Sequence, residues 1–427
     1  PRSSISGSAT SRPASGASTG QCPRRLIGLR RDARTMVRTH DKKRICIVVF
    51  PFKSPYAECG QNYLNQYIRL IAPNVKELNV ICGNYRPSGL PDNVTLYNTK
   101  APIIDVYSKE SVLSQLHRII SGQLLLTVKL IQLRRTFDIY NIYMWTGAIL
   151  LPTLVAKLFN KKIWLTVTGS PSKSSKMMYT SIGGWIIPNL IWFIEQTNNA
   201  LANKIFLSGG QNMMDEMGLG RYSEKVVPHA YNFYLDFDKL RLEKNISERQ
   251  NIIGYIGRQS PEKGFMKFLE CIKILSERNC PLKCLVIGDG VQRELAIKYL
   301  SQHNLTDLVE ILGWVRYDEI AKYLNDIKIH VLASETEALG GTNLEAMACG
   351  AISLVNNVGG LPDTVFDRYN GFILEDNRPE TIANKVIDVI NDEDLSLIQK
   401  NAREYVERTF SEQKVVEQWR VLLVEND

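Results

Sequence analysis

Short apolar runs alternate with helical patterns along this chain, and they do so in two successive series. The first run, at residues 45–50, is apolar throughout, as expected for a parallel strand that is buried on both faces of its sheet. Further strands of the first series are expected at 77–82, 94–97, 138–144, 162–168 and 204–208, with a helix that ends near Ile71 and others at 109–133, 147–159 and 183–202. Strands that alternate with helices predict a doubly wound α/β domain built on a parallel sheet.

The pattern breaks near residues 228–238 into a polar, aromatic linker, and a second series of the same kind follows. Its strands are expected at 251–256, 283–287, 308–311, 328–332, 351–355 and 371–374, with helices at 263–278, 291–303, 317–325, 342–349 and 379–391. A chain of 427 residues is long for one domain. We therefore expect an N-terminal domain at 44–230 and a C-terminal domain at 231–410.

The positive charge of the chain is concentrated at its start. Residues 1–44 hold eleven Lys or Arg and two acidic residues, a net charge of +9, so the total of +8 leaves about −1 for the remainder. A nearly neutral body does not argue for a nucleic-acid partner. Residues 1–43 are expected to be a disordered basic tail, because they are rich in Ser, Gly, Ala and Arg. The tail is interpreted either as an organelle transit peptide or as an extension before a true start at Met36.

Cysteine and histidine usage argues against a zinc site. The eight cysteines include no Cys-x-x-Cys pair and the five histidines are scattered, so a reducing cytosol is the expected location. Two apolar stretches, 124–133 and 185–193, are shorter than the roughly 18–20 residues that span a bilayer. They fit either a peripheral contact with the cytoplasmic face of a membrane, given Lys129, Arg134 and Arg135 and two Trp, or two core-facing helices.

The most specific motif follows the expected strand at 328–332 and reads Glu335-Thr-Glu-Ala-Leu-Gly-Gly-Thr-Asn-Leu-Glu345. Gly340 and Gly341 allow backbone amides to approach a ligand, and free amides at the start of a helix suit a phosphate. Glu337 and Glu345 flank this turn, and a carboxylate can accept hydrogen bonds from two adjacent hydroxyls of a sugar or a ribose. The combination predicts a nucleotide-sugar site; an ordinary β-turn-α crossover with surface glutamates is the alternative.

This segment resembles the Glu-x7-Glu motif of retaining glycosyltransferases with the GT-B fold, specifically glycosyltransferase family 4. Sequence motifs similar to those of the family also occur at 344–350, at 357–363 and 370–372, and in the loop Tyr255-Ile-Gly-Arg-Gln-Ser-Pro-Glu-Lys-Gly264. The resemblance is specific over residues 250–375 and diffuse over the N-terminal half. It implies two Rossmann-like domains, an active site in the cleft between them, and a last helix within 411–427 that crosses back to the first domain.

The resemblance also implies an activity and a set of site residues. The expected reaction moves a sugar from a UDP-, GDP- or other nucleotide-diphosphate donor to an acceptor hydroxyl on a glycan or lipid-linked sugar, with no cofactor and no metal. Its catalytic residues are Arg258 and Lys263, which hold the diphosphate as it gains negative charge, and Glu337, which holds the sugar. The implied donor-binding residues are Gly257, Gly340, Gly341, Thr342, Asn343, Leu344 and Glu345, the last on the ribose. A covalent intermediate and a same-face attack are both compatible with retention.

The N-terminal half departs from the family pattern. The family often has His-Gly after a strand of this domain, and here Thr168-Gly169-Ser170-Pro171 stands in its place. Gly169 and Ser170 are therefore expected only to contact an acceptor or line the cleft. The same is expected of Gly60, in the loop 52–61. Glu195 lies in a stretch similar to a family pattern, and we interpret it as part of a helix that leads into a core strand.

Other motifs and functions were weighed against this interpretation. The Gly-x-Gly at 288–290 lacks the third glycine of a dinucleotide site. Asp236-Phe-Asp238 resembles a metal-binding Asp-x-Asp, but it lies in the linker and fits capping carboxylates better. A hydrolysing epimerase would need acidic and histidine bases in the cleft. A non-catalytic scaffold would be favoured by loss of Arg258 or Lys263, and both are present.

Overall fold

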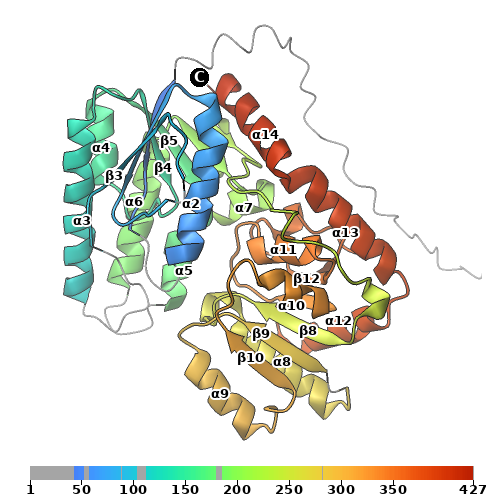
Figure 1. Ribbon diagram of the computed structural model, residues 1–427. Helices are drawn as coiled ribbons and strands as arrows, with labels where there is room; N and C mark the ends of the chain where they lie inside the picture. Colours follow the sequence, from blue (N-terminus) through green and yellow to red (C-terminus); the bar gives the residue numbers. More distant parts are fainter. Residues whose placement is uncertain are drawn as a thin grey trace, which may run out of the picture.

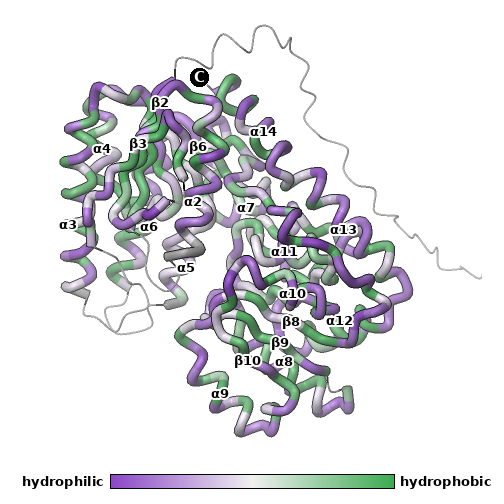
Figure 2. The backbone as a smooth tube through the Cα atoms, viewed as in Figure 1, coloured by the Kyte–Doolittle hydropathy of each residue, from purple (hydrophilic) through white to green (hydrophobic). Residues whose placement is uncertain are grey.

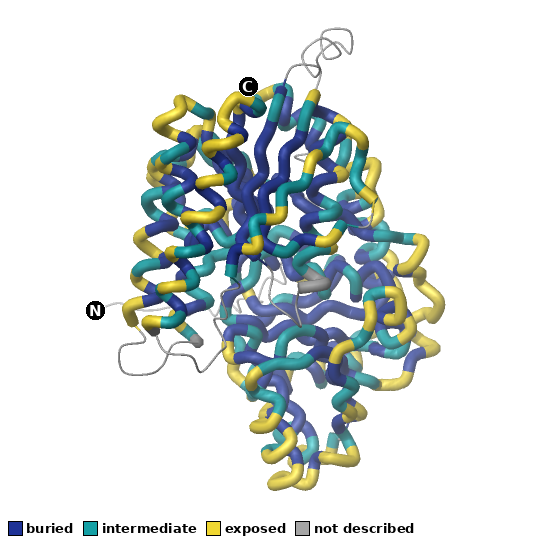
Figure 3. Tube along the Cα trace, turned by 60° about the vertical axis from the view of Figure 1, so that its left-hand side comes forward, coloured by how far each residue is buried: buried dark blue, intermediate teal, exposed yellow. Residues whose placement is uncertain are grey.

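The computed structural model describes residues 43–51, 57–87, 89–102, 112–178, 185–280 and 282–426. These residues form two domains, each built on one parallel sheet, as the sequence predicts (Figure 1). The predicted tail at 1–43, apart from Lys43, and residues 52–56 of the loop 52–61 lie outside the described residues. In Figure 3 the strands at the centre of each domain are buried, and the exposed positions lie mainly on the surrounding helices and loops.

The N-terminal sheet has seven strands in the order β3-β2-β1-β4-β5-β6-β7, and all its pairings are parallel. Six of the strands were predicted, and the short edge strand β7 was not. The strands are β1 (Arg44–Val48), β2 (Glu77–Cys82), β3 (Val94–Asn98), β4 (Ile139–Tyr143), β5 (Lys162–Val167), β6 (Lys204–Leu207) and β7 (Val226–Val227). Alternate residues of β1 enter different cores: Ile45 and Ile47 pack on one face of the sheet, and Cys46 and Val48 on the other.

The helices of the N-terminal domain connect these strands. They are α2 (Ala57–Ile71), α3 (Val112–Gln132), α4 (Leu151–Leu158), α5 (Pro171–Met178), α6 (Ile186–Leu201) and α7 (Gln211–Glu216). The sequence did not predict α5 and α7, which are too short to show a clear apolar period. No helix in the described part of the chain has the length and apolar character that a bilayer crossing requires.

The C-terminal sheet has six parallel strands in the order β10-β9-β8-β11-β12-β13, all of them predicted. They are β8 (Ile252–Ile256), β9 (Lys283–Ile287), β10 (Val309–Gly313), β11 (Ile329–Leu332), β12 (Ile352–Asn356) and β13 (Phe372–Leu374). The helices are α8 (Phe265–Glu277), α9 (Arg293–Gln302), α10 (Ile320–Asp326), α11 (Gly341–Ala348), α12 (Pro379–Ile390), α13 (Leu395–Phe410) and α14 (Glu412–Glu425). Helix α13 was not predicted, although its buried Leu395, Ile398, Ala402, Val406 and Phe410 recur at intervals of three or four.

The last helix, α14, packs against the N-terminal domain beside α2 (Figure 1). Trp419 is fully buried, donates a hydrogen bond of 2.5 Å from Nε1 to the carbonyl of Tyr231, and meets the ring of Tyr67 edge-on. Lys43, which the sequence analysis placed in the tail, is buried instead, and its Nζ donates to the carbonyl of Leu423.

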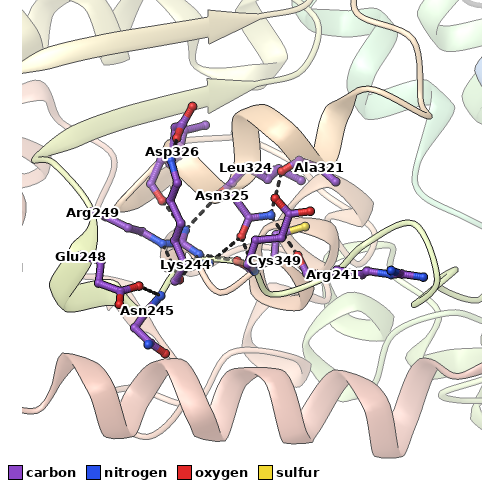
Figure 4. A network of polar contacts seen from close by, with 12 residues as sticks. Arg241, Lys244, Asn245, Glu248, Arg249, Ala321, Leu324, Asn325, Asp326 and Cys349 are labelled. Carbon is purple, nitrogen blue, oxygen red and sulfur yellow. Dashed lines mark hydrogen bonds and ion pairs between the residues drawn. The ribbon is translucent and has the colours of Figure 1, made fainter.

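A buried arginine joins the segment 239–251, which precedes β8, to two helices of the C-terminal domain (Figure 4). Arg249 donates to the carbonyls of Lys244 at 2.9 and 3.1 Å, Leu324 at 2.9 Å, Ile327 at 2.6 Å and Cys349 at 2.5 Å. The last three carbonyls lie at the carboxyl ends of α10 and α11, where the helix dipole favours a cation. Burial lowers the pKa of Arg249 to about 10, so the guanidinium remains charged at neutral pH.

Two further side chains hold the carboxyl end of α11. Arg403, from α13, donates to the carbonyls of Ala348 and Leu240, the latter at 2.6 Å. Gln399, from the same helix, donates to the carbonyl of Gly350 at 2.8 Å. The short helix α11 is therefore fixed at its carboxyl end by Arg249, from the segment before β8, and by α13. These contacts determine the direction of its amino end.

Loss of the Arg249 guanidinium is expected to destabilise the fold strongly. Arg249→Met would leave several buried carbonyls without donors, and we expect the free energy of unfolding to fall by about 3–5 kcal/mol. Urea unfolding followed by circular dichroism measures this change. The control is Arg316→Met, whose side chain is 72% exposed and pairs with Asp318, so a change below about 1 kcal/mol is expected. Equal unfolding midpoints for the two variants would contradict the assignment.

Candidate active site

The loop that follows β8 presents Arg258 at the carboxyl end of the C-terminal sheet. The Arg258 side chain is 32% exposed, and its Nη2 lies 3.4 Å from Oε1 of Glu262, whose side chain is 1% exposed. The same oxygen of Glu262 accepts a hydrogen bond of 2.7 Å from the hydroxyl of Ser260. A buried, hydrogen-bonded carboxylate thus positions a cation that remains partly accessible.

The Gly-x-Gly segment after β9 supports this loop from behind. A Cβ atom on Gly288 would lie 2.0 Å from the carbonyl oxygen of Gly257, and one on Gly290 would lie 2.4 Å from that of Gln259. The amide of Gln259 also donates to the carbonyl of Asp289 at 3.0 Å. Close packing of two loops therefore accounts for both glycines, and Gly257 is a backbone contact in that packing.

Lys263 and Glu337 form an ion pair. Lys263 Nζ lies 2.6 Å from Glu337 Oε2, and the two side chains are 19% and 13% exposed. The hydroxyl of Ser334 donates to the same carboxylate oxygen at 3.2 Å. The sequence predicted these residues for different groups of the donor and gave no sign of the pair, because 74 positions separate them along the chain.

The amino end of α11 lies beside this pair. Gly340 caps the helix with φ at +68°, a left-handed conformation that glycine adopts without strain. The Oη of Tyr63, from α2 of the other domain, lies 2.5 Å from the position that a Cβ on Gly341 would take. Both domains therefore meet at the start of α11.

Two predicted donor-binding residues serve the helix itself. The amides of Asn343 and Leu344 donate to the carbonyl of Gly340 at 2.8 and 3.1 Å, and both side chains are fully buried. Their amides are thus engaged in the first turn of α11. The amides that precede them, of Gly341 and Thr342, make no backbone hydrogen bond with another described residue and are the ones positioned for a ligand.

Glu345 lies one turn further into α11. Its side chain retains some exposure, but protein surrounds most of the carboxylate, and this desolvation raises its pKa to about 8. A carboxylate in such a place is stabilised by ligand groups that donate hydrogen bonds. Hydroxyls are groups of that kind.

The loop that contains Glu337 also contacts the N-terminal domain. Glu216, at the end of α7, accepts hydrogen bonds from the hydroxyl of Thr336 at 2.9 Å and from the amide of Gly359 at 2.6 Å. A Cβ on Gly359 would lie 1.6 Å from the carbonyl oxygen of Glu337, so a glycine is required there. The predicted motif at 357–363 thus packs on the Glu337 loop and helps to join the domains.

The remaining predicted cleft residues lie on the N-terminal domain. Gly60 is in the first turns of α2, and Gly169 and Ser170 connect β5 to α5. Ser170 lines a pocket of about 420 Å³ that lies between α5, α6 and α7. Glu195 and Glu216 line the same pocket, so it extends to a residue that contacts the Glu337 loop.

The linker carboxylate Asp236 caps a turn. Its Oδ1 accepts the amides of Asp238 at 3.1 Å and Lys239 at 3.3 Å, which is the capping role that the sequence predicted. Within the ranges that the structure describes, no group of three or more His, Cys, Asp or Glu side chains is arranged to hold a metal ion.

The site lies in a segment with known relatives. The family model described as "Glycosyl transferases group 1" matches residues 236–408, which include every strand of the C-terminal sheet. Residues 236–408 of this chain therefore match the group 1 glycosyltransferases. The resemblance to glycosyltransferase family 4 is thereby confirmed.

One relative in sequence and two solved structures illustrate these similarities. The chain is 30% identical over 193 residues to the capsular polysaccharide biosynthesis glycosyltransferase CapM of Staphylococcus aureus, which covers 43% of this chain and 50% of CapM. The structure of Anabaena HepE in complex with UDP matches with a TM-score of 0.64 and 18% identity, over 89% of this chain and 99% of HepE. Sucrose-phosphate synthase from Thermosynechococcus elongatus matches with a TM-score of 0.67 and 16% identity, over 90% and 99% of the two chains.

The sequence matches and the structural matches cover different lengths of the chain. The chain spans about half the length of the curated relatives it matches in sequence. The structural matches cover nearly all of it and show that both domains together adopt the predicted GT-B fold.

The raised pKa of Glu345 predicts a pH-dependent stability. A carboxyl group that binds its proton more tightly in the folded state destabilises the fold as pH rises from its ordinary pKa to about 8. Glu345→Gln cannot ionise, so the variant should melt at a higher temperature than the wild type near pH 9 and at the same temperature near pH 4. Scanning calorimetry across this range measures the difference. Glu417→Gln, at a position that is 58% exposed, is the control and should show no such trend.

Proposed function

We propose that this chain transfers a sugar from a nucleoside-diphosphate donor to an acceptor hydroxyl, with retention of configuration and without a metal ion. The observation that carries this proposal is the arrangement at the amino end of α11. The amides of Gly341 and Thr342, which make no backbone hydrogen bond with another described residue, lie in the motif 335–345 together with the desolvated Glu345 and with Glu337, the partner of Lys263. The match of residues 236–408 to the group 1 family and the UDP in the HepE structure support a nucleotide donor.

The diphosphate is assigned to the start of α11 and to the two cations. The amides of Gly341 and Thr342 and the positive end of the helix dipole suit a phosphate. Arg258 is partly exposed at the neighbouring loop, and Lys263 lies on the same loop. As the bond to the sugar breaks, negative charge grows on the leaving phosphate, and fixed cations stabilise that charge more than they stabilise the intact donor.

The ion pair between Lys263 and Glu337 holds both side chains in position before a donor binds. A phosphate that binds Lys263 weakens the pull of that ammonium on Glu337, whose carboxylate then becomes available to accept hydrogen bonds from sugar hydroxyls. The sugar gains positive charge in the transition state, and a nearby carboxylate favours that charge. Holding the pair together before binding keeps both groups in place without unpaired burial of either one.

The ribose is assigned to Glu345. Two adjacent hydroxyls can donate to one carboxylate, and they favour its ionised form. Because the pKa of the free group is about 8, binding below that pH should release a proton. Nucleotide affinity is therefore expected to increase as pH rises from 6 toward 8.

The acceptor is assigned to the pocket between α5, α6 and α7. Glu195 is 5% exposed, its Oε1 has no hydrogen-bond partner among the described residues, and burial raises its pKa to about 7. Trp192, on the same helix, also lines the pocket. Glu216 lines this pocket and contacts the Glu337 loop, which supports an acceptor hydroxyl bound on the side of the proposed donor site. A glycan or a lipid-linked sugar fits these groups.

Nucleotide binding tests the proposal directly. In titration calorimetry with UDP and GDP, Glu345→Gln should weaken binding about tenfold, since a hydrogen bond to a charged group contributes roughly 1.5–3 kcal/mol. Glu337→Gln should hardly change the Kd, because its carboxylate faces the sugar and not the nucleotide. The reverse pattern would exchange the two roles. Absence of binding by the wild type to any nucleoside diphosphate would contradict the function.

The second test concerns turnover. With a donor found by that screen and in excess EDTA, Lys263→Met should lower kcat by about 10²–10³-fold, the scale for one transition-state stabiliser. Lys267→Met is the matched control, because Lys267, in the first turn of α8, forms a similar but more exposed pair with Glu335. Its kcat should stay within a few-fold of the wild type. Wild-type activity that vanishes in EDTA and returns with Mg²⁺ would contradict metal independence.

A further inference from the structure

The outer side of α3 is apolar along most of its length. Its exposed large residues are Leu113, Ile120, Leu124, Leu125, Val128 and Ile131. Most of them recur at intervals of three, four or seven, so they share one side of the helix, opposite the buried Leu126 and Leu130. The sequence interpretation of core-facing helices thus describes only one side of α3. A stripe of this length that faces away from the core requires an explanation.

The apolar surface continues onto two neighbouring helices. On α4 and just after it, Leu158 is 82% exposed and Phe159 38% exposed, and the guanidinium of Arg134, after α3, lies 6.0 Å from the Phe159 ring. On and just before α6, Trp185, Ile186, Trp192 and Phe193 are exposed. Asn198 of α6 donates to the carbonyl of Ile149, next to α4, at 2.7 Å, so the helices are adjacent. Figure 2 shows this side of the domain coloured by hydropathy.

The same part of the chain is strongly basic. Residues 112–194 contain nine Lys or Arg and one acidic residue, Asp138, a net charge of +8. Asp138 itself is paired with Arg44 at 2.7 Å. Because residues 45–427 together have a net charge of about −1, the rest of that body must be about −9. The near-neutral total therefore conceals a basic flank, and Arg135, Lys157 and Lys162 are exposed on it.

We propose that the outer face of α3, α4 and α6 binds the surface of a membrane that contains anionic lipids. Apolar and Trp side chains would enter the interface, and the basic residues around them would contact the headgroups. Charge complementarity selects this partner. A second copy of the chain would bring two faces of the same charge together, and a nucleic acid would leave the apolar stripe in water.

Vesicle binding by the full chain tests this proposal and does not depend on the proposed activity. The wild type should co-sediment with vesicles of phosphatidylcholine and phosphatidylglycerol, and much less with phosphatidylcholine alone. The variant Leu124→Gln, Val128→Gln, Trp185→Gln should lower the partition coefficient at least about tenfold, because it removes the apolar contact area. The basic tail is unchanged in both proteins, so it cannot produce the difference.

A matched variant on the other domain is the control. Leu295→Gln, Ile297→Gln and Leu397→Gln replace three apolar residues that are 52%, 52% and 56% exposed, compared with 51%, 55% and 67% for Leu124, Val128 and Trp185. This variant should bind vesicles as the wild type does, and all three proteins should share one melting temperature. Equal binding by both variants would overturn the proposal. So would a loss of self-association without a loss of vesicle binding, which would assign the face to a second copy.

Discussion

The side chains that hold the carboxyl end of α11 determine where its amino end lies. Arg249 and Arg403 donate to the carbonyls of Cys349 and Ala348, and both arginines come from segments outside the C-terminal sheet. A helix of eight residues has little stability of its own, so its direction depends on such contacts. Because Gly341, Thr342 and Glu345 are all on α11, the proposed phosphate and ribose positions would be set together by this network.

The second constraint is the direct contact between the domains. Glu216 accepts hydrogen bonds from Thr336 and Gly359, and Asp363 accepts one from the amide of Gly210 at 2.6 Å. These contacts lie on the loops that surround Glu337. A change in the angle between the domains would therefore alter the surroundings of the donor sugar and of the acceptor pocket at once. The fully buried Trp419 ties α14 to the N-terminal domain and resists such a change.

Most helices and strands can be predicted from the local pattern of the sequence. Contacts between residues that are far apart in the chain cannot. Apolar runs predicted every strand except β7, whose two residues are too few to form a run. Periodicity identified α3 as a helix but did not show that its apolar residues lie on two sides, one in the core and one in water. The Lys263–Glu337 pair was out of reach, because residues far apart in the chain meet only through sheet topology. The net charge of residues 45–427 did not reveal the basic flank, because the acidic remainder of the body cancels its positive charge.

The two proposals meet at Trp192. This residue is exposed on the apolar face of α6 and also lines the pocket that contains Glu195. An acceptor anchored in a lipid surface would have its polar end at the level of the headgroups, where an interfacial Trp is also expected. The residues proposed to bind the donor lie on the other domain, where a water-soluble nucleotide would reach them. The division between an acceptor domain at a surface and a donor domain in solution would follow from the placement of apolar and charged residues alone.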